Sequence, residues 1–421
     1  MLNGGGGLNA DGLALDLQFA ADKTLTARKG PTPVFTRGST GTFVGSDGLI
    51  QTAATNIPRF DHTSAGVCRG LLIEESRTNL TVRSDDFGAG EWNQAAQRNL
   101  TVTANNTASP SGATDADLLT VGATTTTYQV VQALPATGNI TSGTAYTVSC
   151  FFKAKEVTRV NIHAGNQVTF PADAIFDLTG VGSIIGTPTG TASIQQYPNG
   201  WYRCIITATA GATSNTSFRI SPVSGTSRTY VGNSVDSFWA WGAQLEAGSF
   251  ATSYIPTTAS SLTRSADVCT ITAADFNRFY NSTSGTLLSE ASISNLIGSN
   301  RGIVQIDSGT NLSVMRHVYG LPEGGFRSLI RASGDTATEL STVLGAASTI
   351  QKRIIAYEET GFASVTNGGA VATATRTMPT GLNAMRIGNL TDSSFYLSGH
   401  IAAIRFYKKR LPNAKLVALT T

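Results

Sequence analysis

The segment SFWAWGAQLEAGSF (residues 237–250) places two tryptophans and one glutamate on a single alternating stretch. A glycosidase uses one carboxyl group beside the scissile sugar bond and a second one roughly 5 to 10 Å away. Asp173 and Asp236 could supply the second group, but no spacing places either of them beside Glu246. The favoured interpretation is therefore that Glu246 ends a strand and hydrogen-bonds a turn or faces a neighbouring domain.

Aromatic side chains are the second source of chemistry, because the C–H faces of sugars pack on flat rings while nearby amides bond the hydroxyls. The candidate carbohydrate-binding residues are four rings and two polar partners: Trp92, Tyr202, Trp239, Trp241, Asn161 and His163. Core packing is the alternative for every tryptophan. If a ring is exposed, we expect Trp92, which follows a loop, or Tyr202, which has the opposite strand parity to Trp201.

Metal and cofactor chemistry has little basis in the sequence. The four histidines are scattered without an HExxH pair, and the Gly4–Gly7 run precedes no phosphate-cradling helix. We therefore predict no cofactor. A calcium ion is an alternative, with hard oxygen ligands near turns as its candidates: Asp307, Asn389 and Asp392.

The composition indicates how such side chains would be positioned. Only 14% of the 421 residues are charged, against about 25% in ordinary soluble proteins. Thr, Ser, Asn and 44 glycines take their place, which favours short strands joined by tight turns. The sequence thus predicts an all-β fold: an N-terminal arm with short strands, followed by two antiparallel β-sandwich domains of jelly-roll type.

Charge and hydropathy exclude several classes of partner. The net charge is +3 and the longest basic run is Lys408-Lys409-Arg410, so we expect no nucleic-acid partner. We also expect neither a signal peptide nor a membrane span, since no apolar run approaches about 18 residues. The cysteines form no CxxC pair; Cys150 and Cys204 lie in apolar strand patterns, which predicts core packing in a reducing cytoplasm.

Three parts follow from the spacing of strands and turns. Residues 1–77 begin with the glycine run and contain short apolar segments that would add strands to a neighbouring domain or subunit. Residues 78–264 carry about eight alternating runs, which predicts a two-sheet sandwich. Residues 265–421 repeat this pattern and form a second sandwich.

Alternation within single segments predicts which side chains share a face. Tyr146, Val148, Cys150 and Phe152 should face one side of their strand. The same parity sets Trp239, Trp241 and Ala243 against Phe238, Ala240 and Gly242, and it sets Ala402, Ile404 and Phe406 against Ile401, Ala403 and Arg405. Leu411-Pro412-Asn413 should stop the last strand, and the sequence LPNAKLVAL (411–419) predicts a short terminal helix.

Three stretches carry a family resemblance: GSDGLIQTAATNIPRFDH with CRGLLIEESRTNL (45–80), WGAQLEAGSFATSYIPTTASSLTRSADV (241–268) and GHIAAIRFYKKRLPNAKLVAL (399–419). In this order they resemble the virion fibre and head-spike proteins of tailed phages and phage-like particles. The resemblance implies a carbohydrate-binding-module-like jelly roll at 78–264 and a concanavalin A-like (laminin-G-like) sandwich at 265–421. The family's motifs are architectural and transfer no ligand-binding residue.

The function that this resemblance implies is non-enzymatic. It is a fibre or spike on the virion surface, made in the bacterial host cytoplasm, that contacts host surface polysaccharide and aids adsorption. The N-terminal arm would attach to capsid, portal or tail proteins, and the protein would form a homo-oligomer such as a trimer. The alternatives are a polysaccharide depolymerase, although phage depolymerases usually resemble repeating β-helices, and a purely structural capsid decoration protein.

Overall fold

The computed structural model of the protein describes residues 12–92, 99–134, 140–166, 168–294, 300–320, 325–342, 349–391 and 395–421. Within these ranges the chain is mostly β-strand, and its α-helices are short: α2 (Phe19–Asp22), α3 (Ala273–Phe279) and α4 (Asn413–Thr420). The all-β prediction is confirmed. The glycine run of the predicted attachment arm lies outside the described residues. No helix in the described ranges is long and apolar enough to cross a membrane.

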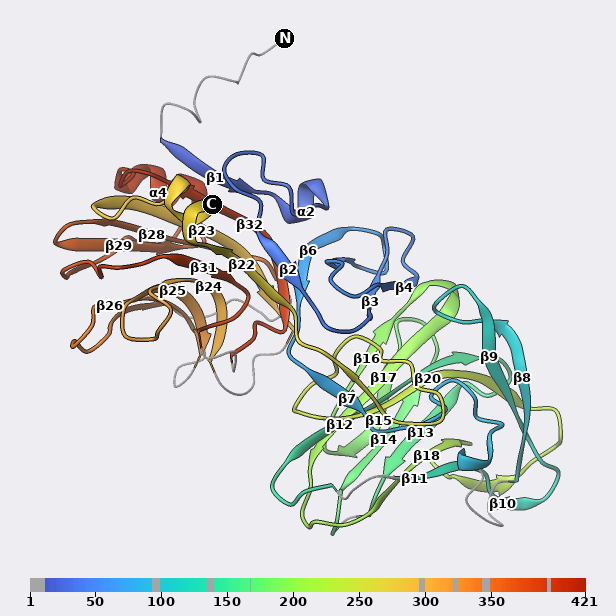
Figure 1. The fold of residues 1–421 in the computed structure, drawn as a ribbon. Helices are drawn as coiled ribbons and strands as arrows, with labels where there is room; N and C mark the ends of the chain where they lie inside the picture. Colours follow the sequence, from blue (N-terminus) through green and yellow to red (C-terminus); the bar gives the residue numbers. More distant parts are fainter. Residues whose placement is uncertain are drawn as a thin grey trace.

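The strands between Leu100 and Ala247 form a sandwich of two antiparallel sheets (Figure 1). One sheet has the order β16-β17-β12-β20-β9-β8, with strands β8 (Leu100–Ala108), β9 (Thr114–Val121), β12 (Ala145–Ala154), β16 (Thr191–Gln196), β17 (Trp201–Thr209) and β20 (Ser237–Ala247). The other has the order β11-β18-β13-β14-β15, with strands β11 (Val130–Leu134), β13 (Arg159–Ala164), β14 (Ala172–Asp177), β15 (Ser183–Thr189) and β18 (Thr216–Pro222). A ribbon of β10 (Thr125–Thr127) and β19 (Thr229–Val231) and the 3-10 turns η1 (Gly90–Trp92) and η2 (Pro198–Gly200) complete this jelly roll.

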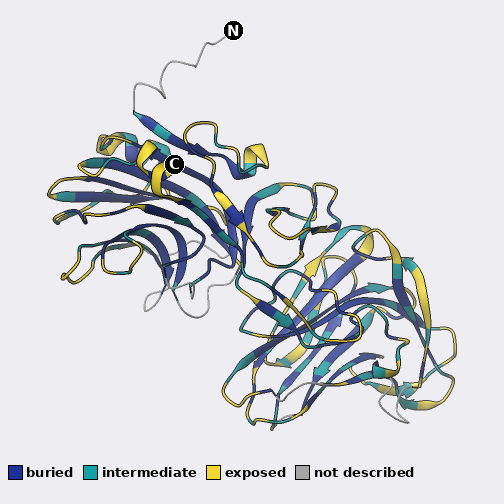
Figure 2. Ribbon diagram, viewed as in Figure 1, coloured by how far each residue is buried: buried dark blue, intermediate teal, exposed yellow. Residues whose placement is uncertain are grey.

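Side-chain alternation places the core of this jelly roll between its two sheets. Tyr146, Val148, Cys150 and Phe152 of β12 all lie in that core, as their parity predicts. Cys204 of β17 packs opposite Cys150, so both cysteines serve as small buried side chains. Figure 2 shows buried residues along most of the strands, whereas the exposed residues lie mainly on turns and on edge strands such as β8.

A second sandwich contains the strands after Leu262 together with strands from the beginning of the chain. One sheet has the order β30-β29-β28-β23-β32-β6-β5, and β1 pairs with the C-terminal half of β32. Its strands are β1 (Leu13–Leu17), β5 (Phe60–His62), β6 (Cys68–Ile73), β23 (Ser284–Ile293), β28 (Gln351–Glu358), β29 (Gly361–Thr366), β30 (Ala372–Thr375) and β32 (Gly399–Tyr407). The facing sheet, in the order β2-β22-β31-β24-β25-β26-β27, has β2 (Val34–Thr36), β22 (Val268–Thr272), β24 (Arg301–Asp307), β25 (Val314–Gly320), β26 (Gly325–Arg331), β27 (Thr338–Thr342) and β31 (Ala384–Ile387).

Strands β1, β2, β5 and β6, from the first 77 residues, are structural parts of this second sandwich. Leu15, Leu17 and Phe19 lie in its core, and β1, drawn in blue, lies along β32, drawn in red (Figure 1). The short segments therefore add strands to a domain of the same chain. These strands join the sandwich because their apolar side chains become buried there, since none of them could form a core alone.

The hairpin of β3 (Gly41–Val44) and β4 (Ile50–Ala53) leaves the second sandwich and reaches the jelly roll. Ile50 packs with aromatic residues of the jelly roll, and its N–H donates to the carbonyl of Pro110 at 2.9 Å. Nearby, β7 (Arg77–Asn79) pairs with β21 (Leu262–Arg264). The domain boundaries predicted after residues 77 and 264 both fall at this two-stranded ribbon.

The C-terminal segment matches its predicted elements but not its predicted parity. Strand β32 ends at Tyr407 and α4 begins at Asn413, as the proline break indicates. The register of β32 shifts at Ala402, because Ala403 pairs with Glu290 whereas Ile401 pairs with Ala291. Ile401 therefore shares the core with Ile404 and Phe406, and the predicted opposition of these side chains is wrong.

Candidate functional site

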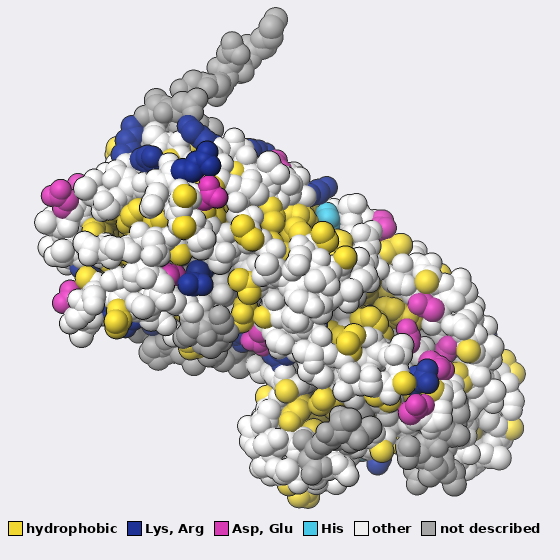
Figure 3. Space-filling model, in the orientation of Figure 1, with side chains coloured by type: hydrophobic (Ala, Val, Ile, Leu, Met, Phe, Trp, Pro, Cys, Tyr) yellow, Lys and Arg dark blue, Asp and Glu magenta, His cyan; other side chains and the backbone are white. Residues whose placement is uncertain are grey.

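A groove of about 630 Å³ lies where the two sandwiches meet. Its walls are the outer face of the sheet that contains β16 and β17, the β3–β4 hairpin with the neighbouring β5 and β6, and residues 249–254, which follow β20. Pockets of this size at domain interfaces are common binding sites for small ligands and sugars. Much of the face of the molecule drawn in Figure 3 is uncharged, as its wide white and yellow areas show.

Aromatic rings on the outer face of the sheet form the base of this groove. Phe151 points outward because its neighbours on β12 fill the jelly-roll core. Its ring centroid lies 5.1 Å from that of Tyr197 and 5.4 Å from that of Trp241, both in edge-to-face geometry. Tyr254 lies 4.5 Å from Trp241. Phe151, Tyr197 and Tyr254 line the groove, and Tyr197 is the half-buried ring among them.

Polar side chains line one wall at alternate positions of a strand. Thr191, Ser193 and Gln195 of β16 are exposed and point into the groove, while Thr207 lies opposite Thr191 on β17. This edge strand presents hydroxyl and amide groups beside the Tyr197 ring. Such a combination suits a sugar, whose apolar face packs on a ring while its hydroxyls form hydrogen bonds.

The opposite wall contains a half-buried cation and a fixed carboxylate. Arg69, between Cys68 and Gly70 on β6, lines the groove. Asp61 of β5 accepts a hydrogen bond from the Val44 N–H at 2.7 Å, and His400 Nε2 lies 2.7 Å from its other oxygen. Asp61 is therefore held in place by both the hairpin and β32.

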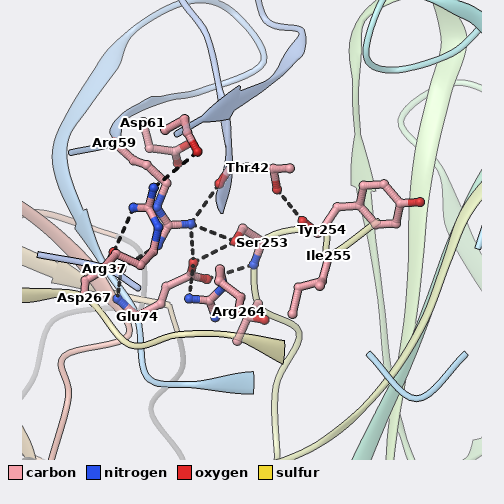
Figure 4. A network of polar contacts seen from close by, with 12 residues as sticks. Arg37, Thr42, Arg59, Asp61, Glu74, Ser253, Tyr254, Ile255, Arg264 and Asp267 are labelled. Atoms are coloured by element: carbon pink, nitrogen blue, oxygen red, sulfur yellow. Dashed lines mark hydrogen bonds and ion pairs between the residues drawn. The ribbon is translucent and has the colours of Figure 1, made fainter. Parts of the chain in front are cut away.

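A buried cluster of charges lies behind this wall and joins the segments that form it (Figure 4). Glu74 contacts Arg59 at 2.7 Å and Arg264 at 3.2 Å, and Asp267 contacts Arg37 at 3.1 Å and also Arg59. All three guanidinium groups are almost fully buried. Because charges buried in this way must remain paired, the cluster fixes the relative positions of the N-terminal strands and the segment after β20.

Glu74 is the central anion of this buried cluster. The Ser253 N–H and hydroxyl donate to its two oxygens at 2.8 and 2.7 Å, which ties the groove segment to β6. Burial alone would raise the pKa of Glu74, but the Arg264 and Arg59 guanidinium groups hold it well below its usual range. Glu74 is therefore a structural carboxylate and is not a proton donor near neutral pH.

Glu246, the candidate catalytic carboxylate of the sequence, is also structural. It is fully buried near the end of β20 and accepts hydrogen bonds from the Thr252 N–H at 2.9 Å and the Thr252 hydroxyl at 2.7 Å. Gln244 donates to it at 2.7 Å. The interpretation that Glu246 hydrogen-bonds a turn beside a domain junction is confirmed.

Trp92 and Tyr202, expected to be the exposed rings, are both buried in the jelly-roll core. The η1 turn folds Trp92 inward against Phe87 and Phe218, and its indole N–H donates to the Arg83 carbonyl at 2.8 Å. Tyr202 faces inward and donates its hydroxyl to the Gly180 carbonyl at 2.8 Å. The expectation that either ring is exposed is wrong, because both find a core contact and an acceptor for their polar atom.

Trp239 and Trp241 share the outer face of β20, as their parity predicts, and neither enters the core between the sheets. Trp241 is buried under the groove segment, whereas Trp239 is half-buried and donates to Asn106 at 2.9 Å. Neither indole is among the groove-lining side chains. Trp241 supports the base of the groove from below.

Parity within β20 changes at a bulge. Gly242 and Ala243 together oppose Cys150, so Ala243 turns into the core with Phe238 and Ala240. The predicted pairing of Ala243 with the tryptophan face is therefore wrong. Gly242 adopts a φ of +65°, a left-handed conformation that lacks a steric cost only for glycine.

Replacing Gly242 by Ala tests the importance of this bulge. A left-handed conformation costs a non-glycine residue about 1–2 kcal/mol, and the new Cβ would lie 3.0 Å from Phe151 Cδ2. We expect Gly242→Ala to lower the free energy of unfolding in urea by more than Gly225→Ala. Gly225 has a nearly identical φ of +64° but no neighbouring atom within 4 Å. Equal losses for both variants would contradict a packing role of the bulge.

Asn161 and His163, the predicted polar partners, lie on the opposite face of the jelly roll from the groove. Both point outward from β13, where Asn161 donates to Asp173 at 2.6 Å and His163 lies 3.8 Å from the same carboxylate. The rings and polar groups that the sequence suggested as one site are therefore separated by the thickness of the sandwich.

The groove residues Tyr197, Ser193, Gln195 and Arg69 were not identified from the sequence. The segment TASIQQ does show polar residues at every second position, which is the pattern of a half-exposed strand. This pattern does not predict which other segments of the chain face the strand across the groove.

The calcium candidates that the structure describes, Asp307 and Asn389, are both buried. The Asp307 carboxylate accepts hydrogen bonds from the Gly309 N–H at 2.8 Å and from the Arg386 and Gln305 side chains. Asp392 lies outside the described residues. Across the part of the chain that the structure describes, no three His, Cys, Asp or Glu side chains gather as metal ligands.

Comparison with known proteins gives only distant structural matches. No protein-family model matches the chain, and no curated protein sequence matches it. A carbohydrate-binding module (CBM40) of a Ruminococcus gnavus IT-sialidase bound to α2,3-sialyllactose matches at 15% identity and a TM-score of 0.30, covering 33% of this chain and 83% of the module. Domain 4 of the arabinanase AbnA from Geobacillus stearothermophilus matches at 9% identity and 0.31, covering 41% and 82%. A pentraxin from Limulus polyphemus matches at 9% and 0.26, covering 33% and 70%. We base no functional argument on similarity at this level.

Proposed function

We propose that this protein is a non-enzymatic glycan-binding protein that uses the interdomain groove to hold host surface polysaccharide. The observation that carries this proposal is the half-buried Tyr197 ring beside the exposed Ser193 and Gln195 side chains in a groove of about 630 Å³. A ring and a row of hydrogen-bonding groups recognise the two different faces of a sugar.

The state of the groove carboxylates supports binding without cleavage. Asp61 and Glu74 are the acidic side chains among the groove-lining residues. Glu74 is paired with two arginines, and Asp61 is held by His400 and the Val44 N–H. A glycosidase requires one carboxyl group with a raised pKa, and Glu74 has the opposite shift.

We further propose that the protein is a fibre or spike on the surface of a phage or phage-like particle. The three stretches that resemble such proteins meet at the groove and the ion cluster behind it. The first contributes Arg59, Asp61 and Glu74, the second contributes Ser253, Arg264 and Asp267, and the third contributes His400. The three stretches thus build one junction between the two sandwiches. This supports the view that they resemble the phage proteins because they form the same structural element.

Multiple copies would compensate for a weak individual site. Linking several sites on one particle raises their effective concentration, so that total avidity can exceed single-site affinity by about 10²–10⁴-fold. Under this proposal the protein is a homo-oligomer, such as a trimer, attached to capsid, portal or tail proteins through the residues before Gly12. It is made in the bacterial cytoplasm and acts on the virion surface.

The groove can be tested with neighbouring glutamines of one strand. Gln195 lines the groove, whereas Gln196 does not and bonds the Gly180 carbonyl at 3.3 Å. We expect Gln195→Ala to weaken binding of host polysaccharide by about three- to tenfold, the value of one hydrogen bond, and Gln196→Ala to leave it unchanged. Tyr197→Ala should weaken binding further. Calorimetric titration of the purified protein with capsular or lipopolysaccharide oligosaccharides measures these effects.

Experiments with the same host glycans distinguish the alternatives. Absence of binding to any host glycan would favour a decoration protein and contradict the proposal. In a separate reducing-end assay, release of reducing ends from the polysaccharide by the unaltered protein would instead identify a depolymerase.

A further inference from the structure

A second hollow, of about 690 Å³, lies on the other face of the jelly roll, where the β10–β19 ribbon flanks the sheet of β13 and β18. Its charged and ionisable lining residues are His163, Arg219 and Arg228. The remaining lining is polar, with threonine hydroxyls on both strands of the ribbon. It shares no lining residue with the interdomain groove.

The sheet register aligns the charged side chains of this hollow. Asp173, His163 and Arg219 lie at the same level of the adjacent strands β14, β13 and β18. They point outward because their neighbours Ile162 and Phe218 fill the core. Three residues from separate parts of the sequence are thus brought into one row.

Hydrogen bonding defines the state of His163. Arg228 Nη1 lies 2.5 Å from His163 Nδ1, and because guanidinium can only donate, Nδ1 must be the acceptor. His163 Nε2 then carries the proton and donates to the Gly165 carbonyl at 3.0 Å. Burial and the nearby Arg228 and Arg219 charges lower the pKa of His163, opposed in part by Asp173. The imidazole is therefore neutral and holds Arg228 in place.

The charges of this row are not balanced. Among the residues that the structure describes, Asp173 pairs with Arg228 at 3.7 Å, whereas no carboxylate pairs with Arg219. Arg219 is half-exposed, its Nε atom is buried, and that atom has no hydrogen-bond partner among the described residues. The half-exposed Arg219 guanidinium thus lines a polar hollow without a carboxylate partner among the described residues, which is an arrangement that attracts a planar anion such as a carboxylate.

We propose that this hollow binds the carboxylate of an acidic sugar, with Arg219 as the anion-binding group and Arg228 as its positioned neighbour. The exposed hydroxyl of Thr226 and the half-buried hydroxyl of Thr126 lie where they can bond the sugar ring. This site goes beyond the proposed function, because it adds a second contact of different chemistry on the opposite face of the same sandwich. A polysaccharide with both neutral and acidic units would engage both faces.

The test uses calorimetric titration of the full-length protein with a galacturonic acid trisaccharide, the neutral galactose trisaccharide and inorganic phosphate. We expect Arg219→Gln to weaken binding of the acidic trisaccharide by about ten- to hundredfold, because a charge-assisted hydrogen bond is lost. The matched control is Arg83→Gln, which removes the same charge but lies outside the hollow, where Arg83 pairs with Glu91 at 3.7 Å. That variant should bind within about twofold of the unaltered protein, since the pair is partly exposed.

Two outcomes would overturn this inference. Equal affinity for the neutral and acidic trisaccharides would exclude carboxylate recognition, and phosphate binding without sugar binding would leave only a general anion site. The groove variant Gln195→Ala should bind the acidic trisaccharide in this hollow normally. Failure of the acidic-sugar site is therefore distinguishable from failure of the groove.

Discussion

Replacing Glu74 by Gln is expected to lower the free energy of unfolding at pH 7 by about 3–5 kcal/mol, the cost of leaving buried charges without their partner. The Arg59 and Arg264 side chains beside Glu74 are almost fully buried, so water cannot take over the role of the carboxylate. Glutamine keeps the size of the side chain but removes the charge. Urea denaturation followed by circular dichroism measures the loss.

Acid should remove this difference. The folded-state pKa of Glu74 is depressed below its ordinary value of 4.5, so its stabilising contribution is complete above that pH and declines as the pH falls below it. The unaltered protein should therefore lose stability below about pH 4.5 and approach Glu74→Gln. The matched control is Glu358→Gln, whose side chain is 63% exposed and which should cost less than about 1 kcal/mol. Equal stability of Glu74→Gln and Glu358→Gln would show that the cluster does not hold the junction.

Replacing Trp92 by Ala should cost about 3–5 kcal/mol of unfolding free energy, which is typical for deleting a buried aromatic side chain. The ring is completely buried against Phe87 and Phe218, and its N–H is satisfied by the Arg83 carbonyl. Removal leaves a cavity in the jelly-roll core and an unpaired carbonyl. Differential scanning calorimetry is the suitable measurement, because the loss of a tryptophan also changes the fluorescence signal.

Trp239→Ala is the control for this prediction. Trp239 is half-buried on the outer face of β20, where it contacts Asn106 and lies 5.5 Å from Lys153 Nζ. Its loss should be clearly smaller than that of Trp92, since less apolar area returns to water. If the two variants lost equal stability, Trp92 would not occupy the core position that the structure assigns to it.

Features of the fold that depend on residues close together in the sequence were predicted correctly, whereas features that depend on a paired strand were not. The alternation Tyr146, Val148, Cys150, Phe152 correctly predicted a core-facing row, because period-2 sterics act within one strand. The break at Leu411-Pro412-Asn413 correctly predicted that the last strand is followed by a short helix, α4. Parity failed at Gly242 and Ala402, because each strand carries a bulge whose position depends on the strand paired with it.

The candidate site was less accessible to prediction. Glu246 was interpreted correctly because a single carboxylate without a partner is more often structural than catalytic. The exposure of Trp92 and Tyr202 was predicted wrongly, since their local patterns fit a loop or an outer face as well as a core. Tyr197 and Gln195 were missed because the groove exists only where β16 meets segments from both ends of the chain.

The sequence by itself determined the local properties of this protein: low charge, frequent turns and alternating segments require short antiparallel strands, whose apolar faces must be buried. The tertiary structure decided which charges pair and which faces meet. Arg37 and Asp267 are separated by 230 residues yet form one buried ion pair, and Asp173, His163 and Arg219 become neighbours only through strand register. Such contacts form only when strands that are distant in the sequence pair with each other. A local pattern of residues does not determine which strands pair.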